Sequence, residues 1–151
     1  MASFHLTNIT ISAAAVASMV AGYHGLVFAA PPQAAATKSV WDGVYTKEQA
    51  GRGQAKYAQV CSNCHQAYLT GSDQAPALAG GDFLDRWDGQ SVGDLADRIR
   101  TTMPLDDVGS LNIQLSADIT AYLLQANSLP AGQEELKADR AAMKAIALKR
   151  K

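Results

Sequence analysis

Apolar side chains recur every three or four residues in three stretches of the 151-residue chain, and this spacing predicts three helices. The helices are expected over residues 47–61, 91–100 and 116–126. Thr46 is the expected N-cap of the first, and Gln49, three residues later, completes the pattern of a capping box. No run alternates between apolar and polar residues strictly enough to predict a sheet. The fold class predicted from this pattern is therefore all-α.

The ends of the other elements follow from their capping and turn residues. Ser91 is the expected N-cap of the second helix, with Asp94 at its third position, and Ser116 is the expected N-cap of the third. Residues 66–82 are rich in Gly, Ala, Pro and Asp and are predicted to form a loop. Gly53 lies inside the first helix, where the lack of a side chain would permit another helix to cross closely.

The charged residues divide the chain into parts of different character. The formal net charge of −1 excludes a chain that binds nucleic acid through an overall basic surface. Residues 39–129 hold 6 basic and 11 acidic side chains, and residues 130–151 hold 6 basic and 3 acidic ones. The sequence therefore predicts an acidic central domain, residues 37–129, and a basic C-terminal tail, residues 130–151, that is helical by composition. The tail carries a thin apolar stripe, formed by Leu136, Met143 and Ile146.

The N-terminal stretch is set apart by the absence of charge, because no Asp, Glu, Lys or Arg occurs before Lys38. An apolar run over residues 9–22 is followed by small residues, a pattern typical of a secretory signal peptide. Residues 1–36 are therefore predicted to be a leader that exports the protein to the periplasm. An uncleaved membrane anchor is the alternative, since residues 9–30 are long enough to cross a bilayer.

Both cysteines of the chain fall in one motif, Cys61-Ser62-Asn63-Cys64-His65. Cys-x-x-Cys-His is the attachment signature of c-type haem. Thiols three positions apart lie on one side of a helical turn and can bond two vinyl groups of the macrocycle, while His65 is presented to the iron. A thioredoxin-like dithiol, a zinc site and a simple disulfide are the alternatives. The sequence therefore predicts one haem c, bound covalently through Cys61 and Cys64.

Met103 is the candidate for the second axial ligand of the iron. Of the four methionines, Met1 and Met19 lie in the leader, and Met143 lies among charged residues of the tail. Met103 follows the second predicted helix and precedes Pro104, which favours an extended backbone at position 103 and so gives the thioether a defined direction. Filling a gap in the hydrophobic core is the alternative role for this methionine.

Taken together, these motifs resemble the class I mono-haem cytochromes c over residues 46–127. The resemblance rests on the motif of residues 61–65, on Pro76 and Leu78 after it, and on Met103 followed by proline. It implies a small cytochrome c fold with three or more helices packed around one covalently attached haem. It also implies that His65 and Met103 are the axial ligands, and that the Pro76 carbonyl accepts the proton of the other ring nitrogen of His65.

The same resemblance implies a pocket around the haem. Its expected walls are Leu78, Phe83, Leu95, Ile99 and Leu105, for which ordinary core packing is the alternative role. Trp87 is expected either to donate its indole N–H to a haem propionate or to pack in the core. Gly53 and Tyr57 would meet Tyr122 where the first and last helices cross.

The function implied by the resemblance is one-electron transfer in the periplasm by a protein that is not an enzyme. The expected partners are redox proteins, with a periplasmic dehydrogenase as donor and an oxidase or another cytochrome as acceptor. The acidic central domain favours a partner with a basic docking patch. We expect no binding to nucleic acid, and membrane association only if the leader is retained. Two alternatives stay open: a haem subunit bound permanently to a periplasmic dehydrogenase, and a peroxidase or ligand-sensing haem protein with an open sixth position.

Overall fold

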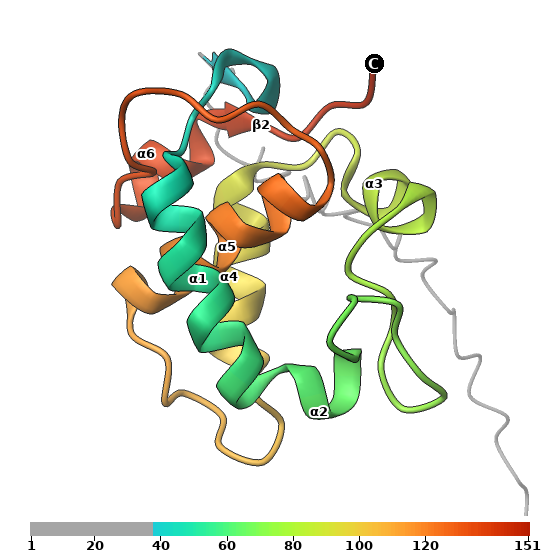
Figure 1. Ribbon diagram of the computed structural model, residues 1–151. Helices are drawn as coiled ribbons and strands as arrows, with labels where there is room; N and C mark the ends of the chain where they lie inside the picture. The colour runs from blue at the N-terminus through green and yellow to red at the C-terminus, as the bar shows by residue number, and fades with distance from the viewer. Residues whose placement is uncertain (1–37) are drawn as a thin grey trace, which may run out of the picture. The chain divides into compact units, whose positions relative to one another are not determined.

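Six α-helices account for most of the regular structure in the computed structural model, which describes residues 38–151 (Figure 1). The helices are α1 (Lys47–Val60), α2 (Ser62–His65), α3 (Gly81–Trp87), α4 (Val92–Thr102), α5 (Ile113–Ala126) and α6 (Arg140–Lys144). The remaining elements are a 3-10 helix, η1 (Val40–Asp42), and two short strands, β1 (Lys38–Ser39) and β2 (Ile146–Ala147). The prediction of a mostly helical protein is confirmed. The predicted leader, residues 1–36, lies outside the described residues.

Helices α1 and α4 begin at the predicted caps. The Thr46 hydroxyl accepts a hydrogen bond from the backbone N–H of Gln49 at 3.1 Å. The Gln49 side chain does not return this bond, as a capping box would require, because it is fully buried and its Nε2 donates to Asp118 at 3.1 Å. At α4, Ser91 and Asp94 form the complete capping box. Local capping chemistry therefore determines both starting points.

Helix α5 begins about one turn earlier than predicted. Its N-cap is Asn112, whose side-chain oxygen accepts a hydrogen bond from the backbone N–H of Leu115 at 2.9 Å. Ser116 lies inside the helix, where its hydroxyl donates to the Ile113 carbonyl at 2.9 Å, so the prediction of Ser116 as N-cap is wrong. Both Asn and Ser are good N-caps. The longer helix is favoured because its extra turn packs Leu115 against the hydrophobic core.

The loop predicted over residues 66–82 ends two residues early, because α3 begins at Gly81. Phe83, on this short helix, is buried in the core. Seven residues are too few to show a clear apolar period, which is why the sequence pattern does not reveal α3. Within residues 38–151, none of the helices has both the length and the apolar character needed to cross a bilayer.

Helix α1 packs chiefly against α5, and the two backbones come closest at Gly53. A Cβ atom at this position would lie 1.9 Å from the carbonyl oxygen of Asp118, so only glycine fits. One turn further along α1, the ring of Tyr57 packs against the ring of Tyr122, with centroids 5.3 Å apart. The helix crossing expected at Gly53, Tyr57 and Tyr122 is present in the structure.

Residues 130–151 do not form the helix predicted for them. Only Arg140–Lys144 is helical, and Ile146–Ala147 forms β2, which pairs in parallel with β1. Figure 1 shows this segment, coloured orange to red, crossing the top of the view beside β1. Leu136 is buried, and its backbone is bonded to the buried Gln49 side chain, which donates to the carbonyl at 2.9 Å and accepts from the N–H at 2.7 Å. The backbone of Leu136 is therefore bonded to a side chain of α1 instead of to its own segment, as it would be in a helix. The C-terminal segment belongs to the same compact unit as the helices.

Three of the six basic residues of the C-terminal segment are bound to acidic residues of the helices. Their four ion pairs are Arg140 with Asp97, Lys144 with both Asp94 and Asp97, and Arg150 with Asp85. Partial burial alone would raise the pKa of Asp94, but hydrogen bonds from Lys144 and Ser91 lower this pKa to about 2. The basic segment therefore neutralises part of the acidic domain within the same molecule.

Replacing Gly53 by alanine is expected to lower the free energy of unfolding by about 1–3 kcal/mol, because the new Cβ must push α1 away from α5. Gly51 is the matched control on the same helix, since no atom lies within 4 Å of its Cβ position. Gly51→Ala should leave stability unchanged or raise it by up to about 1 kcal/mol. Denaturant unfolding of both variants measures the difference, and equal stabilities would contradict the close crossing.

Replacing Lys144 by glutamine is expected to lower the free energy of unfolding at neutral pH by about 1 kcal/mol, since Asp94 loses its cationic partner. The pKa of Asp94 is about 2 in the folded protein, below its ordinary value of 3.8. The stabilisation is therefore present above about pH 4 and is lost as the pH falls towards 2.

Urea unfolding of wild type and Lys144→Gln between pH 7 and pH 2 checks this expectation. The difference between the two proteins should shrink below about pH 4. Lys149→Gln is the control for the change in net charge, because Lys149 is exposed and has no ion pair within residues 38–151. A difference that stays constant down to pH 2 would show that the Lys144–Asp94 pair does not stabilise the fold.

Candidate functional site

The motif of residues 61–65 forms one helical turn directly after α1. Cys61 links α1 to α2, and the backbone N–H groups of Cys64 and His65 donate to its carbonyl oxygen at 3.2 and 3.0 Å. Both cysteines are free thiols, and the element before them is a helix rather than a strand. This geometry favours neither the disulfide nor the thioredoxin-like alternative. Within residues 38–151, no group of three or more His, Cys, Asp and Glu side chains is placed to hold a metal ion.

The His65 ring is held by one hydrogen bond, with its Nδ1 atom 2.8 Å from the carbonyl oxygen of Pro76. A carbonyl oxygen only accepts, so Nδ1 carries the proton and donates. The lone pair of Nε2 is therefore free to bind a metal, as in metal sites where the other ring nitrogen is tied to a carbonyl. The residue is only 8% exposed, so the ring is packed as well as hydrogen-bonded.

The loop between His65 and Pro76 is folded back tightly enough to make this contact. Gly71 has a φ of +73°, and a Cβ atom there would lie 2.4 Å from the backbone nitrogen of Ala77. Glycine at this position therefore allows the two arms of the loop to touch. The Gly71 N–H also donates to the His65 carbonyl at 3.1 Å. The Tyr57 hydroxyl donates to the Gln66 carbonyl at 2.7 Å and anchors the start of the loop to α1.

The far end of the same loop is held by α5. The side chain of Asn127, which follows this helix, donates to the Leu78 carbonyl at 3.0 Å and accepts from the Gly80 N–H at 2.9 Å. The position of Pro76, and with it the orientation of the His65 ring, thus depends on both helices of the α1–α5 crossing.

Met103 lies at the C-terminus of α4 and enters the same cavity as His65. Its backbone is extended, with φ −126° and ψ 153°, as expected for a residue before proline. Its N–H donates to the Ile99 carbonyl at 3.0 Å, which fixes where the helix ends. The backbone at Met103 is therefore defined on one side by the last turn of α4 and on the other by Pro104.

A single cavity of about 1060 Å³ brings the predicted site residues together. Pockets for cofactors and other small molecules usually measure about 300–1,000 Å³, so this cavity has room for a large cofactor. Its lining includes all eleven predicted site residues: Cys61, Cys64, His65, Pro76, Leu78, Phe83, Trp87, Leu95, Ile99, Met103 and Leu105.

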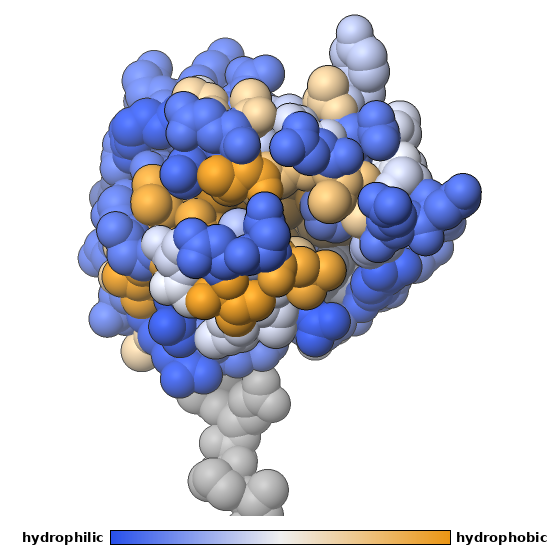
Figure 2. Space-filling model, turned by 90° about the horizontal axis from the view of Figure 1, so that it is seen from below, coloured by the Kyte–Doolittle hydropathy of each residue, from blue (hydrophilic) through white to orange (hydrophobic). Residues whose placement is uncertain are grey.

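The walls of the cavity are largely apolar, although Asp94 and Asp97 of α4 also line it, and its rim is partly exposed. Phe83, Leu95 and Ile99 are buried, whereas Leu105 is 74% exposed and lies at the rim rather than in the wall. Figure 2 views the face that carries α2 and the loop after α4, where apolar residues gather around a hollow. Such a lining suits a flat apolar molecule that is shielded from water along most of its surface.

Burial changes the acid–base behaviour of one thiol at the cavity. It raises the pKa of Cys61 to about 11, although the nearby ammonium group of Lys56 acts in the opposite direction. The thiol is therefore protonated at neutral pH. Reactive dithiols have lowered pKa values, so this environment favours a role for Cys61 other than thiol–disulfide exchange.

Several cavity residues carry no role in the sequence-based prediction. Ile119 and Leu123, one turn apart on α5, extend the apolar wall. Arg86 on α3 and Arg98 on α4 also line the cavity, whereas Arg100 is paired with Asp97 at 3.7 Å. Arg98 lies three residues after Leu95, a predicted wall residue, so the two share one face of the helix. This spacing is the sequence signal that could have identified Arg98 as a cavity residue. Nothing local in the sequence singles out Arg86.

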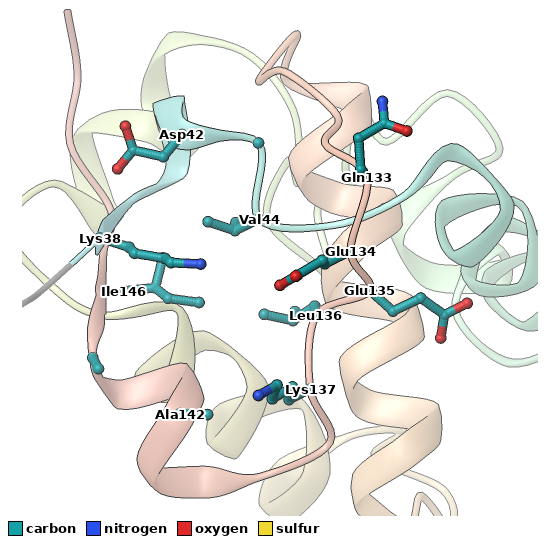
Figure 3. Close-up of a pocket in the computed structure, with 12 residues that line it drawn as sticks. Lys38, Asp42, Val44, Gln133, Glu134, Glu135, Leu136, Lys137, Ala142 and Ile146 are labelled. Atoms are coloured by element: carbon teal, nitrogen blue, oxygen red, sulfur yellow. The ribbon is translucent and has the colours of Figure 1, made fainter.

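A second cavity, of about 510 Å³, lies where η1 and β1 meet the C-terminal segment (Figure 3). Lys38, Glu134 and Lys137 point towards this space, and the walls include Val44 and Leu136. None of its lining residues is a cysteine, histidine or methionine, so it offers no donor set like that of the larger cavity.

Comparisons with known proteins give little guidance. No model of a known protein family matches the sequence, and no curated protein matches it. Among solved structures, the chain is similar to the sulfane dehydrogenase SoxCD from Paracoccus pantotrophus, at 22% sequence identity and a TM-score of 0.46. The similarity covers 83% of this chain and 68% of the other. At this distance, the similarity assigns neither a fold family nor an activity.

Proposed function

We propose that the protein is a c-type cytochrome that transfers single electrons through one haem bound covalently to Cys61 and Cys64. The observation that carries the proposal is that two thiols, an oriented imidazole and a thioether line one largely apolar cavity. Each of these donors suits haem: thiols add to the vinyl groups, and histidine and methionine bind iron. Under this proposal the helices form a small cytochrome c fold around the cofactor.

The chemistry of electron transfer comes from the haem, which in this cavity would supply a couple between ferrous and ferric iron. Cys61 and Cys64 hold the macrocycle through thioether bonds and so prevent its loss. His65 binds the iron through Nε2, while the Pro76 carbonyl keeps the proton on Nδ1 and fixes the orientation of the ring. Met103, which lines the same cavity, would supply its thioether sulfur as a second ligand.

This set of ligands favours a carrier over an enzyme. With histidine and methionine both bound to the iron, the haem would have no open position for a substrate, and this pair of ligands would raise the reduction potential. The buried side chains of Phe83, Leu95 and Ile99 line the cavity and would exclude water from a haem bound there. We place this carrier in the periplasm, where the predicted leader would deliver it, and its partners would be a dehydrogenase and an oxidase or another cytochrome.

The rim of the cavity is the surface at which such partners would dock. Leu105 and Val108 are 74% and 56% exposed. The two residues that separate them in the sequence, Asp106 and Asp107, form no ion pair with any of residues 38–151. An apolar centre with nearby carboxylates suits brief contact with a basic partner. Because the C-terminal segment neutralises Asp85, Asp94 and Asp97, this local pair is a better guide to docking than the charge of the whole domain.

The intact mass of the protein, purified from a host that exports and matures c-type cytochromes, is expected to equal the polypeptide plus one haem. The addition of thiols to vinyl groups loses no atoms, so the full mass of the cofactor is retained. Cys61→Ser combined with Cys64→Ser is the control and should lack the added mass. A wild-type mass without haem would overturn the proposed function.

Replacing Met103 by leucine is expected to open the sixth coordination position while preserving side-chain volume. The reduced wild-type protein should not bind carbon monoxide promptly, whereas reduced Met103→Leu should bind it at once and should have a lower reduction potential. Met143→Leu is the matched control, since Met143 is buried in the C-terminal segment and does not line the cavity. Prompt binding of carbon monoxide by the wild type would instead favour a ligand-binding haem protein.

A further inference from the structure

Two of the three non-glycine residues with a positive φ among residues 38–151 lie within four positions of His65. They are Gln66, with φ +65°, and Leu69, with φ +58°. Gln66 also has ψ 155°, which places its backbone in a region that only glycine adopts easily. Such a conformation raises the energy of the folded chain and persists only where surrounding contacts hold it. The backbone that directly follows His65 is therefore strained.

The contacts that hold this conformation are made by the Gln66 carbonyl oxygen, since the side chain of the residue is exposed. The oxygen accepts hydrogen bonds from the Tyr57 hydroxyl at 2.7 Å and from the Leu69 N–H at 3.1 Å. Tyr57 is only 2% exposed, and burial raises the pKa of its hydroxyl, so the hydroxyl keeps the proton that it donates. A bond from a buried donor of α1 thus offsets part of the strain.

The conformation of Gln66 also decides where the chain runs after α2. Helix α2 ends at His65, and an ordinary helical conformation at Gln66 would continue it. The reversal at Gln66 instead allows the Gly71 N–H to reach the His65 carbonyl at 3.1 Å. It also returns the chain so that the Pro76 carbonyl lies 2.8 Å from the Nδ1 atom of His65. The bond that orients the imidazole therefore depends on a strained backbone one residue away.

We propose that Tyr57 and Gln66 form a latch that positions the His65 ring: the Tyr57 hydroxyl holds the strained turn, and the turn keeps the Pro76 carbonyl on Nδ1. Both are positioning residues, because they act on the imidazole through the backbone of the loop. When the latch opens, Gln66 relaxes to an ordinary conformation and Pro76 moves away from the ring. The role of His65 as an iron ligand rests on the proposed function, whereas the latch involves only contacts among residues 57–76.

The exchange of the His65 Nδ1 proton with solvent measures how often the Pro76 carbonyl leaves the ring. Its rate is followed by nuclear magnetic resonance in the reduced holoprotein, together with the denaturant midpoint. Tyr57→Phe is expected to accelerate exchange about three- to tenfold, since one buried hydrogen bond is lost. Gln66→Gly is expected to slow exchange, because glycine adopts this conformation without strain. The double variant should therefore exchange at close to the wild-type rate.

Tyr45→Phe is the matched control for the loss of a buried hydroxyl. Tyr45 is 1% exposed, and its hydroxyl donates to the carbonyl of Leu129, which is not part of this loop, at 2.6 Å. This variant should lower the denaturant midpoint about as much as Tyr57→Phe does, but it should leave the exchange rate unchanged. Gln66→Ala controls for the loss of the Gln66 side chain. It keeps a Cβ atom and therefore the strain, so it should not slow exchange.

A wild-type exchange rate in Tyr57→Phe would overturn the latch. An equal acceleration in Tyr45→Phe would do the same, because the ring would then be released only when the whole domain unfolds. Exchange in Gln66→Gly that is no slower than in Gln66→Ala would show that the turn is unstrained and would also overturn it. The intact mass of each variant is recorded first. A wild type without haem would refute the proposed function, whereas haem-bearing variants with wild-type exchange would refute only the latch.

Discussion

The close approach of α1 to α5 at Gly53 is the constraint on which the rest of the structure depends. Because no side chain separates the two backbones there, Tyr57 can pack on Tyr122 further along the crossing. The Tyr57 hydroxyl then holds the Gln66 carbonyl at one end of the loop after the motif, and Asn127 holds the other end. A shift between α1 and α5 would therefore move Pro76, which orients the His65 ring.

The same crossing also organises the C-terminal segment. Asp118, opposite Gly53, accepts hydrogen bonds from Gln49 and Arg52, and Arg52 also binds Glu135 at 2.9 Å. The hydrogen bonds to both carboxylates raise the pKa of Arg52 above its ordinary value. After Glu135, the C-terminal segment forms ion pairs through Arg140 and Lys144 with α4 and through Arg150 with Asp85. The near-zero net charge of the protein thus corresponds to contacts inside one molecule rather than to two separately charged surfaces.

The parts of this fold that the sequence predicts are those set by neighbouring residues. The turn of residues 61–65, the caps at Thr46 and Ser91 and the extended backbone at Met103 each depend on a few positions in a row. The predicted cap of α5 is wrong because two good capping residues lie four positions apart, and only packing of the added turn selects between them.

The incorrect prediction for residues 130–151 has a different cause. Its composition suits a helix, but the buried amide of Gln49 satisfies the backbone of Leu136, and β1 pairs with β2 across more than 100 residues of sequence. Arg86 is missed for the same reason, since only the folded chain shows that it lines the cavity and forms no ion pair within residues 38–151. Where a residue's role depends on contacts with elements that are distant in the sequence, the local sequence pattern contains no signal for that role.

The walls of the proposed haem site belong to the same helices that build the core. Leu95 and Ile99 of α4, together with Ile119 and Leu123 of α5, line the cavity and are also part of the hydrophobic core cluster. A flat macrocycle bound there would pack against side chains whose other sides already contact the core, so it would extend that core rather than sit upon it. Anything that binds only the folded chain adds to its stability. Under the proposed function, cofactor attachment and the packing of α4 on α5 therefore stabilise each other.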